Sequence, residues 1–382
     1  MSSIYFDHAA TTPMHEDVIR AYVEAASAGP TNASSLHAHG RSARGRVTAA
    51  RDLLAGLLGC EASELVFTSG GTESDNAALF GAAWAQRARG RNGIVTSAIE
   101  HHAVLHACRE LEKQGFKLTV LPVDDQGRVS VRDAEAAIDE STAVVSIMAG
   151  NNETGTIQPI AEIGESARNH KAIMHVDAVQ AFGYMPLALR ELPVDLLSLS
   201  AHKINGPQGV GLLYIRKGTP FQPLLHGGSQ ERKRRAGTEN IAGIAAFAAA
   251  AELALSNREE RVRHAESVRE AFLSQLRDRI GDETFVVNGG GAERLPHIAN
   301  ISFLGIRSES MLMNLDLAGV SVSGGSACTS GSLQPSHVLE AMGISAERVA
   351  SAVRFSFGLG NNSEEAEKAA EITATIWARL RK

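Results

Sequence analysis

Cysteine is scarce in this chain, and its scarcity argues against one class of protein. The 382 residues include only three cysteines, Cys60, Cys108 and Cys328, and no Cys-x-x-Cys pair. An odd and widely spaced set does not suit the disulfide framework of a small secreted protein. We therefore expect a reducing compartment, and we assign the protein to the cytoplasm.

Long apolar runs and strong charge bias are also missing. The longest apolar segment, residues 241–255, is alanine-rich, contains Glu252 and is too short to span a bilayer. The N-terminal residues have neither a basic region nor an apolar core, so we expect no signal peptide. The formal net charge is −6 and the basic run is confined to residues 231–235. We therefore expect neither a membrane nor a nucleic acid as partner.

Apolar strands and amphipathic helices alternate through the first two thirds of the chain. We expect strands at residues 65–68, 93–97, 117–121, 143–148, 172–176, 194–203 and 210–215. Such alternation predicts an α/β fold with a mostly parallel sheet and helices on both faces. A charged helix follows residue 257, and a short α+β segment comes after it. We expect a large domain at residues 13–256 and a small domain at residues 1–12 and 257–382.

Lys203 is the first candidate catalytic residue. It ends a buried stretch in Ser200-Ala201-His202-Lys203 and precedes a glycine-rich turn. Ligands of open α/β sheets bind beyond the carboxyl ends of the strands. A lysine there, with little water around it, acts as a nucleophile or base because its pKa falls. A solvated turn lysine is the alternative, but hydrogen-bonding neighbours and close glycines favour the functional interpretation.

The sequence pattern of residues 65–84 predicts an anion-binding site. A strand-like segment is followed by the turn Ser69-Gly70-Gly71 and then by residues 72–75, which resemble a capping box that opens a helix. Free N–H groups and the positive end of the helix dipole converge at such a point, so a phosphate is the expected ligand. The alternative is a capped helix with nothing bound. The turn is neither a Walker loop nor a G-x-G-x-x-G turn.

Cys328 differs from the other cysteines in its neighbours. Gly, Ser and Thr surround it between residues 321 and 331, which predicts a mobile, exposed loop where a thiol can ionise and react. Cys108 lies on an apolar helical face, which is the pattern of an inert core thiol, and Cys60 follows a helix end. The alternative for Cys328 is an incidental loop cysteine.

The histidines do not predict a metal centre. His102 and His106 are four residues apart on an expected helix, with Cys108 nearby. No H-E-x-x-H motif and no second ligand cluster with metal spacing accompanies them. We therefore expect no metal. His101 is better interpreted as a polar residue that faces the crevice at the sheet edge, and Asp177 as a buried carboxylate that needs a cationic partner.

Several of these stretches together resemble the motifs of the cysteine desulfurases. The matching stretches are SAHK at 200–203 with GPQGVG at 206–211, HVDAVQ at 175–180, TSGGTESDN at 68–76, NNETG at 151–155 and RAGTEN at 235–240. Cysteine desulfurases are pyridoxal-phosphate enzymes of the class V aminotransferase group, with the fold type I architecture of a seven-stranded sheet. The resemblance covers residues 5–358. Residues 323–331 resemble the cysteine loop of the NifS/IscS-like subgroup, apart from an additional-looking glycine in the Gly324-Gly325 pair.

The resemblance implies a role for each matching residue. Lys203 would bind pyridoxal 5'-phosphate covalently, and Asp177 would pair with its ring nitrogen. His101 would stack on the ring and assist proton transfer, while Gln180 would contact the phenolic oxygen. The residues implied for the phosphate are Gly71, Thr72, Ser200, His202 and, from the other subunit of a homodimer, Thr238. Those implied for the substrate carboxylate are Arg354, Asn152, which also borders the cofactor, and, more weakly, Asn32.

The reaction implied is the conversion of L-cysteine to L-alanine. Lys203 would remove the Cα proton, and the Cys328 thiolate would attack the substrate sulfur. The persulfide on Cys328 would then serve a sulfur acceptor, such as an iron–sulfur scaffold or a tRNA-thiolation relay. The alternatives are a selenocysteine lyase, another β-lyase or an aminotransferase on the same fold, and a non-catalytic adaptor. Cys328 favours a cysteine desulfurase over the other enzymes, because their reactions do not inherently need a thiol on a mobile loop.

Overall fold

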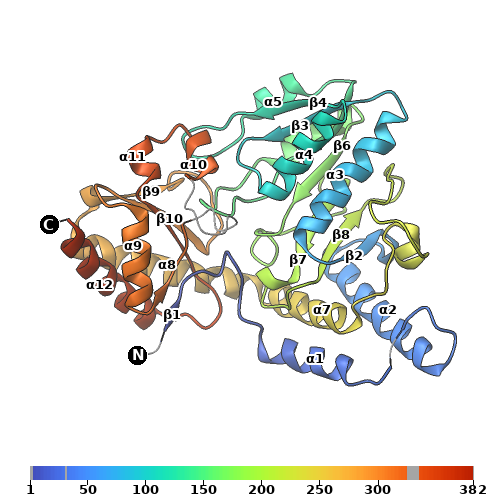
Figure 1. The fold of residues 1–382 in the computed structure, drawn as a ribbon, viewed down its shortest axis with the longest axis horizontal. Coiled ribbons are helices and arrows are strands. Elements are labelled where there is room, and N and C mark those ends of the chain that lie inside the picture. Colours follow the sequence, from blue (N-terminus) through green and yellow to red (C-terminus); the bar gives the residue numbers. More distant parts are fainter. Residues whose placement is uncertain (1–2, 31, 325–334, 382) are drawn as a thin grey trace.

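A seven-stranded sheet forms the centre of the larger part of the molecule (Figure 1). The computed structural model of the protein describes residues 3–30, 32–324 and 335–381. The sheet has the order β2-β8-β7-β6-β5-β3-β4, and β8 runs antiparallel to both of its neighbours while the other pairs are parallel. The strands are β2 (Leu65–Thr68), β3 (Gly93–Ser97), β4 (Lys117–Leu121), β5 (Thr142–Ser146), β6 (Ile173–Asp177), β7 (Leu196–Ser200) and β8 (Gly211–Ile215). The predicted mostly parallel sheet is confirmed.

Helices bury both faces of this sheet. Successive residues of one strand enter different cores, as Phe67 and Val66 of β2 do, so most strands of the sheet are buried on both faces. One core contains α1 (Glu16–Ala26), α2 (Ala38–Leu58), α5 (Val131–Ala137), α6 (Ile160–Asn169) and α7 (Ile241–Ser256). The other contains α3 (Gly71–Arg87) and α4 (His102–Lys113). The sheet is therefore rigid, and its carboxyl edge is a firm base for a site.

A separate core forms the smaller part of the molecule. Its three-stranded antiparallel sheet has the order β12-β10-β9, and β1 pairs in parallel with β11. Phe6, next to β1, packs edge to face on Phe357 and Phe272. The elements are β1 (Ile4–Tyr5), α8 (Arg258–Ile280), β9 (Phe285–Asn288), β10 (Ile298–Phe303), α9 (Ser308–Leu317), β11 (Val320–Ser321), α10 (His337–Ala341), α11 (Ala346–Val349), β12 (Ala352–Ser356) and α12 (Ser363–Leu380). The exact domain boundaries at residues 12 and 257 stay predictions.

Four short 3₁₀ helices complete the described elements. They are η1 (Ala62–Glu64), η2 (Ala201–Lys203), η3 (Gln230–Lys233) and η4 (Asp282–Thr284). Within residues 3–30, 32–324 and 335–381, we find no helix long and apolar enough to cross a membrane.

Candidate active site

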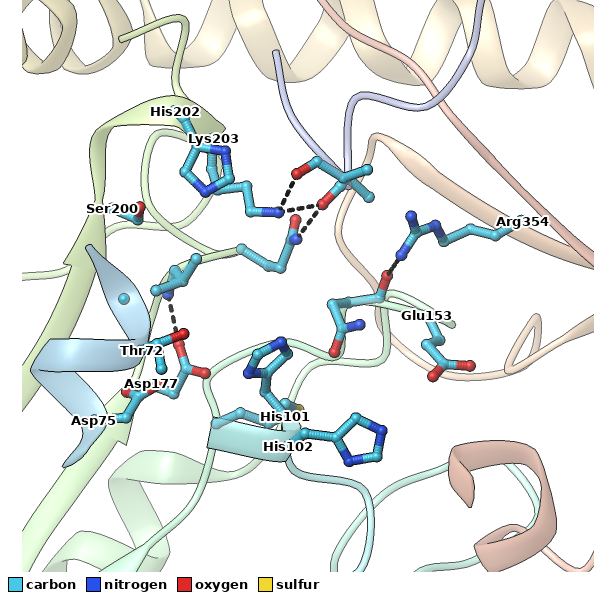
Figure 2. Close-up of a pocket in the computed structure, with 18 of the residues that line it drawn as sticks. Thr72, Asp75, His101, His102, Glu153, Asp177, Ser200, His202, Lys203 and Arg354 are labelled. Carbon is cyan, nitrogen blue, oxygen red and sulfur yellow. Dashed lines mark hydrogen bonds between the residues drawn. The ribbon is translucent and has the colours of Figure 1, made fainter. Parts of the chain in front are cut away.

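A cavity of about 370 Å³ lies at the carboxyl edge of the large sheet. His101 follows β3, Asn152 follows β5, Asp177 ends β6 and Lys203 follows β7, and each of these residues lines the cavity. Arg354 reaches it from β12 of the smaller core (Figure 2). The structure therefore brings together polar residues that are far apart in the sequence.

Lys203 enters the cavity from η2 rather than from a strand. The prediction that the strand continues to Lys203 was wrong, because β7 ends at Ser200 and the chain turns there. Gly206 permits this turn, since a Cβ at Gly206 would lie 2.7 Å from the carbonyl oxygen of Ala201. The Lys203 amine donates hydrogen bonds to the carbonyl oxygens of Ala9 and Ala10, at 2.5 and 2.7 Å. These contacts hold the amine at the cavity wall.

The surroundings of the Asp177 carboxyl group disfavour its negatively charged form. Its side chain is buried, and one of its oxygens, Oδ1, accepts a hydrogen bond from the Val179 N–H at 2.9 Å. Burial raises the pKa of Asp177 to about 6, although the Val179 hydrogen bond and the charge of Lys203 oppose the rise. A protonated ring nitrogen placed against this carboxyl group would gain a strong, charge-assisted hydrogen bond.

His101 presents a neutral imidazole to the cavity. It is the N-cap of α4, and its Nδ1 accepts a hydrogen bond from the Ala103 N–H at 3.1 Å. Burial, followed by the nearby charge of Lys203, lowers the pKa of His101 to about 4. The ring is therefore neutral at neutral pH, and Nε2 carries its single proton. The flat face of this neutral ring suits an aromatic ligand that stacks on it.

The predicted anion site lies at the start of α3. Residues 72–75 are not a capping box, because α3 begins at Gly71 and Thr72 is already inside the first turn. The Glu73 carboxylate instead accepts a hydrogen bond from the Ser69 N–H at 2.8 Å. The first N–H groups of a helix have no partner within it, so those of Gly71 and Thr72 are placed to bind an anion.

Ser200 and His202 lie on the other side of this anion site (Figure 2). His202 Nδ1 is 3.1 Å from the Thr11 hydroxyl oxygen. Burial, followed by the charge of Lys203, lowers the pKa of His202 to about 4. The cavity thus combines hydrogen-bond donors for an anion, the Asp177 carboxyl group, the Lys203 amine and the flat His101 imidazole. This arrangement fits pyridoxal phosphate, which has a phosphate, a ring nitrogen and an aldehyde.

Arg354 is a buried cation whose two hydrogen bonds use only part of its five N–H donors. Its Nη2 donates to Asp7 Oδ1 and its Nη1 to the Asn152 carbonyl oxygen, both at 2.9 Å. Its Nε has no hydrogen-bond partner among the described residues. An arginine held in this way is suited to a carboxylate ligand.

Two of the predicted site residues do not line the cavity of this chain. Thr238 is exposed and borders a separate, small pocket with Ser69 and Arg235. Asn32 is exposed, and its side-chain oxygen accepts a hydrogen bond from the Ser34 N–H at 2.9 Å.

Cys328 lies outside the described residues. The other two cysteines are buried, and burial raises the pKa of each thiol to about 12. The predicted burial of Cys108 in a core is confirmed, and Cys60 is buried as well. In the described part of the chain, no group of three or more His, Cys, Asp or Glu side chains is placed to hold a metal ion.

The sequence analysis missed a buried contact between Glu153 and Ser336. Glu153 lines the cavity with a side chain that is 2% exposed, and its Oε2 accepts a hydrogen bond from the Ser336 hydroxyl at 2.5 Å. Ser336 also caps α10, because its oxygen accepts from the Leu339 N–H. The motif at residues 151–155 identified Glu153 as polar, but nothing in the sequence pointed to Ser336.

Comparison with known proteins shows the family of the chain. The sequence profile of the aminotransferase class-V family matches residues 4–368. The chain belongs to this family, among its cysteine desulfurases. It is 49% identical over 381 residues to a protein of Bacillus subtilis (strain 168) named putative cysteine desulfurase IscS 1, with 100% of both chains covered. It is 45% identical over 378 residues to the cysteine desulfurase IscS of Dictyoglomus turgidum, covering 99% of this chain and 95% of that protein.

Solved structures in this family have the same fold. A NifS-like protein is 36% identical and superposes with a TM-score of 0.92 over 99% of this chain and 100% of its own. A structure described as SspA in complex with cysteine is 33% identical, with a TM-score of 0.82 over 93% of this chain and 99% of its own. The fold type I architecture, the pyridoxal-phosphate cofactor and the cysteine desulfurase activity predicted from the motifs are confirmed.

Proposed function

We propose that the cavity residues described above carry out the desulfuration of L-cysteine to L-alanine. The observation that carries this proposal is the convergence of Lys203, Asp177, His101 and Arg354 on one cavity. Bound there, pyridoxal phosphate supplies an electron sink that stabilises negative charge at the substrate Cα. Asp177 holds its ring nitrogen, His101 covers its ring, and Lys203 binds it covalently. Gln180 donates to its phenolic oxygen.

The phosphate is held by donors from three elements. These are the N–H groups of Gly71 and Thr72 at the start of α3, the Ser200 hydroxyl at the end of β7 and His202 in η2. Together with Asp177 and His101, these donors would hold both the phosphate and the ring of the cofactor in place.

Lys203 moves the Cα proton. Its amine would accept the Cα proton of the substrate as a general base and later return a proton to the product. Its position is restricted by the carbonyl oxygens of Ala9 and Ala10, which also stabilise the ammonium form because both are acceptors. The neutral His101 N–H orients the groups near the Cα.

Arg354 orients the substrate through its carboxylate. Asp7 and the Asn152 carbonyl oxygen each take one N–H of the guanidinium, and its remaining N–H groups would supply donors for the ligand carboxylate. The Asn152 side chain lies beside this position at the cavity wall.

The two flanks of the cysteine loop are attached to residues that line the cavity. The backbone of Ser323 pairs with that of Arg354, with an N···O distance of 2.7 Å, and the Ser336 hydroxyl bonds to Glu153. Cys328 is five residues from the first attachment, so an extended chain places it at most about 18 Å away. This constraint supports the proposal that Cys328 reaches the substrate. Its thiolate attacks the substrate sulfur, the Cβ–S bond breaks, and a persulfide forms on Cys328.

The proposed activity is tested by incubating the purified protein with L-cysteine and measuring alanine and sulfide. Without a thiol reductant we expect a burst of about one alanine per active site, because the persulfide then blocks Cys328. With dithiothreitol, alanine and sulfide should be released continuously and in equal amounts. Continuous alanine release without any reductant or acceptor would contradict the proposal.

Substitution of Arg354 should mainly weaken substrate binding. We expect Arg354→Ala to raise the KM for L-cysteine, because the carboxylate contact is present both before and during the reaction. The expected loss is on the order of 2–5 kcal/mol, the range for truncating one partner of a buried charge pair. Arg354→Lys keeps the charge and loses the two-pronged set of donors, so its KM should lie between those of the parent and Arg354→Ala. Steady-state kinetics on the cofactor-loaded variants give the answer, and an unchanged KM in Arg354→Ala would refute the role.

We propose that the active unit is a homodimer in which Thr238 completes the phosphate site of the partner subunit. The segment before Thr238 is anchored firmly, because Glu231 in η3 forms a buried, two-pronged ion pair with Arg51 at 2.6 and 2.8 Å. Residues 231–233 have positive φ angles of 43°, 56° and 66°, an unusual left-handed turn for side chains other than glycine. The anchored turn leaves Thr238 exposed instead of directing it into its own cavity.

Subunit mixing tests this arrangement. We expect Thr238→Ala to weaken pyridoxal-phosphate binding and Lys203→Ala to be inactive. In a hybrid of the two variants, one site combines an intact Lys203 with an intact Thr238 only if Thr238 acts across the interface. Unfolding and refolding an equimolar mixture should therefore restore parent cofactor affinity and turnover in half of the hybrid sites. Failure to restore either property would place Thr238 in its own subunit's site, or outside the site altogether.

We also propose that the sulfur leaves Cys328 for an acceptor protein, such as an iron–sulfur scaffold, in the cytoplasm. The two free, buried cysteines agree with a reducing compartment. We assign the small domain to residues 1–12 and 257–382, since the separate core contains Phe6 together with α8 and α12. This domain carries Cys328 to the cavity of the large domain, residues 13–256.

A further inference from the structure

The orientation of the Gln180 side-chain amide is set by two neighbours, Ala9 and His297. Its Nε2 donates to the Ala9 carbonyl oxygen at 2.8 Å, and its Oε1 lies 3.3 Å from His297 Nε2. A carbonyl oxygen only accepts, so the amide nitrogen must be the atom that faces Ala9. The amide oxygen must then face His297, whose Nε2 has to be the donor. The second amide hydrogen is left for the cavity, which Gln180 lines.

His297 is held in the form that this geometry requires. It is buried, and burial and the charge of Arg261 keep the pKa of the ring well below its usual value. The other titratable groups that act on it are His8, Lys203 and Arg354, and all of them also disfavour a proton on the ring. A neutral imidazole has a single N–H. The contact with the Gln180 oxygen places that hydrogen on Nε2.

An aromatic stack fixes the His297 ring in position. The ring lies parallel to Tyr184, with centroids 3.9 Å apart and planes 13° apart. The Arg261 guanidinium covers the Tyr184 ring at 4.7 Å, and its Nη1 donates to Asn205 Oδ1 at 3.0 Å. Tyr184 belongs to the core on the large sheet, Arg261 to α8, and His297 precedes β10. The stack therefore joins elements of both cores behind the cavity wall.

We propose that His297 is a positioning residue that fixes the Gln180 amide with an N–H directed at the phenolic oxygen of pyridoxal phosphate. The inference rests on the role proposed for Gln180 in cofactor binding. Without the His297 N–H, the Ala9 carbonyl oxygen alone holds the amide orientation, and a flipped amide that presents an acceptor to an oxygen that carries negative charge becomes easier to populate. A donor at that oxygen favours the deprotonated form of the bound cofactor, so its loss should raise the pH at which the cofactor's visible absorbance changes.

The test compares His297→Phe with His297→Gln. Phenylalanine keeps a flat ring against Tyr184 and removes the N–H, whereas glutamine supplies an amide donor at a similar reach. For His297→Phe we expect the absorbance midpoint of the bound cofactor to rise by about one pH unit, a tenfold change in proton affinity. Cofactor binding, measured by equilibrium dialysis of the apoprotein, should weaken several-fold. His297→Gln should restore both values most of the way.

A double-mutant cycle separates positioning from a structural effect. Gln180→Leu should shift the midpoint as His297→Phe does, and adding His297→Phe to it should produce little further change. This cycle also covers the case in which His297→Phe folds poorly, since His297→Gln can be measured in the same background. If the His297 variants shift the midpoint equally with and without Gln180, or not at all, the inference is overturned. A parent protein that binds no pyridoxal phosphate would instead overturn the proposed site itself.

Discussion

Lys203→Ala should abolish alanine release while leaving the cofactor site largely intact. We expect initial rates to fall by at least about 10²–10⁴-fold, the contribution typical of a general base, and further through loss of the covalent attachment. Pyridoxal phosphate should still bind, because the start of α3, Ser200 and Asp177 do not depend on the Lys203 side chain. The measurements are alanine release and cofactor affinity on the same preparation.

Two controls make this result specific to the amine. Lys113 is an exposed lysine on α4 that pairs with Glu110, and Lys113→Ala should retain the parent rate. Small primary amines added to Lys203→Ala should restore part of the activity if the missing group is the proton acceptor. A Lys203→Ala protein that turns over at the parent rate would remove Lys203 from the mechanism.

Cys328→Ala should separate the chemistry at Cα from the chemistry at sulfur. Lys203 and the cofactor act at Cα, whereas Cys328 acts only on the substrate sulfur. The variant should therefore bind pyridoxal phosphate and L-cysteine, with the spectral change of the parent on mixing. Its alanine release should fall by at least about 10²-fold, a loss comparable to that of other positioned catalytic groups.

The buried cysteines provide matched controls for this variant. Cys60→Ala and Cys108→Ala should remain active, because burial keeps both thiols protonated and away from the cavity. Selenocysteine should partly escape the defect, since selenium leaves more readily without a thiolate to accept it. Desulfuration of L-cysteine by Cys328→Ala at the parent rate would reassign the protein to the other β-lyases of this fold.

The parts of the site that the sequence predicts are those at the ends of strands. Asp177, His101 and Lys203 each follow an apolar run, and parallel strands bring their carboxyl ends to one edge. The local details were harder to predict. The strand was expected to reach Lys203, but a 3₁₀ turn intervenes, and the expected capping box gave way to a helix that begins at a glycine.

The contacts that complete the site come from residues far apart in the sequence. Arg354 bonds to Asp7 across 347 residues, and Ser336 bonds to Glu153 across 183. No local pattern of hydrophobicity or spacing encodes such pairs, because they depend on how the two cores dock. His297 is a similar case, since its sequence neighbours indicate only a buried residue before a strand. Its stack with Tyr184 becomes visible only in three dimensions.

The most direct test of the account is to locate the sulfur after a single turnover. The purified, cofactor-loaded protein is mixed with L-cysteine without reductant, quenched with a thiol-blocking reagent, digested and mapped by mass spectrometry, with alanine measured in parallel. The account predicts one additional sulfur atom on the peptide that contains Cys328 for each alanine released, and none on those with Cys60 or Cys108. Alanine formed in the same amount with no sulfur on Cys328 would contradict it.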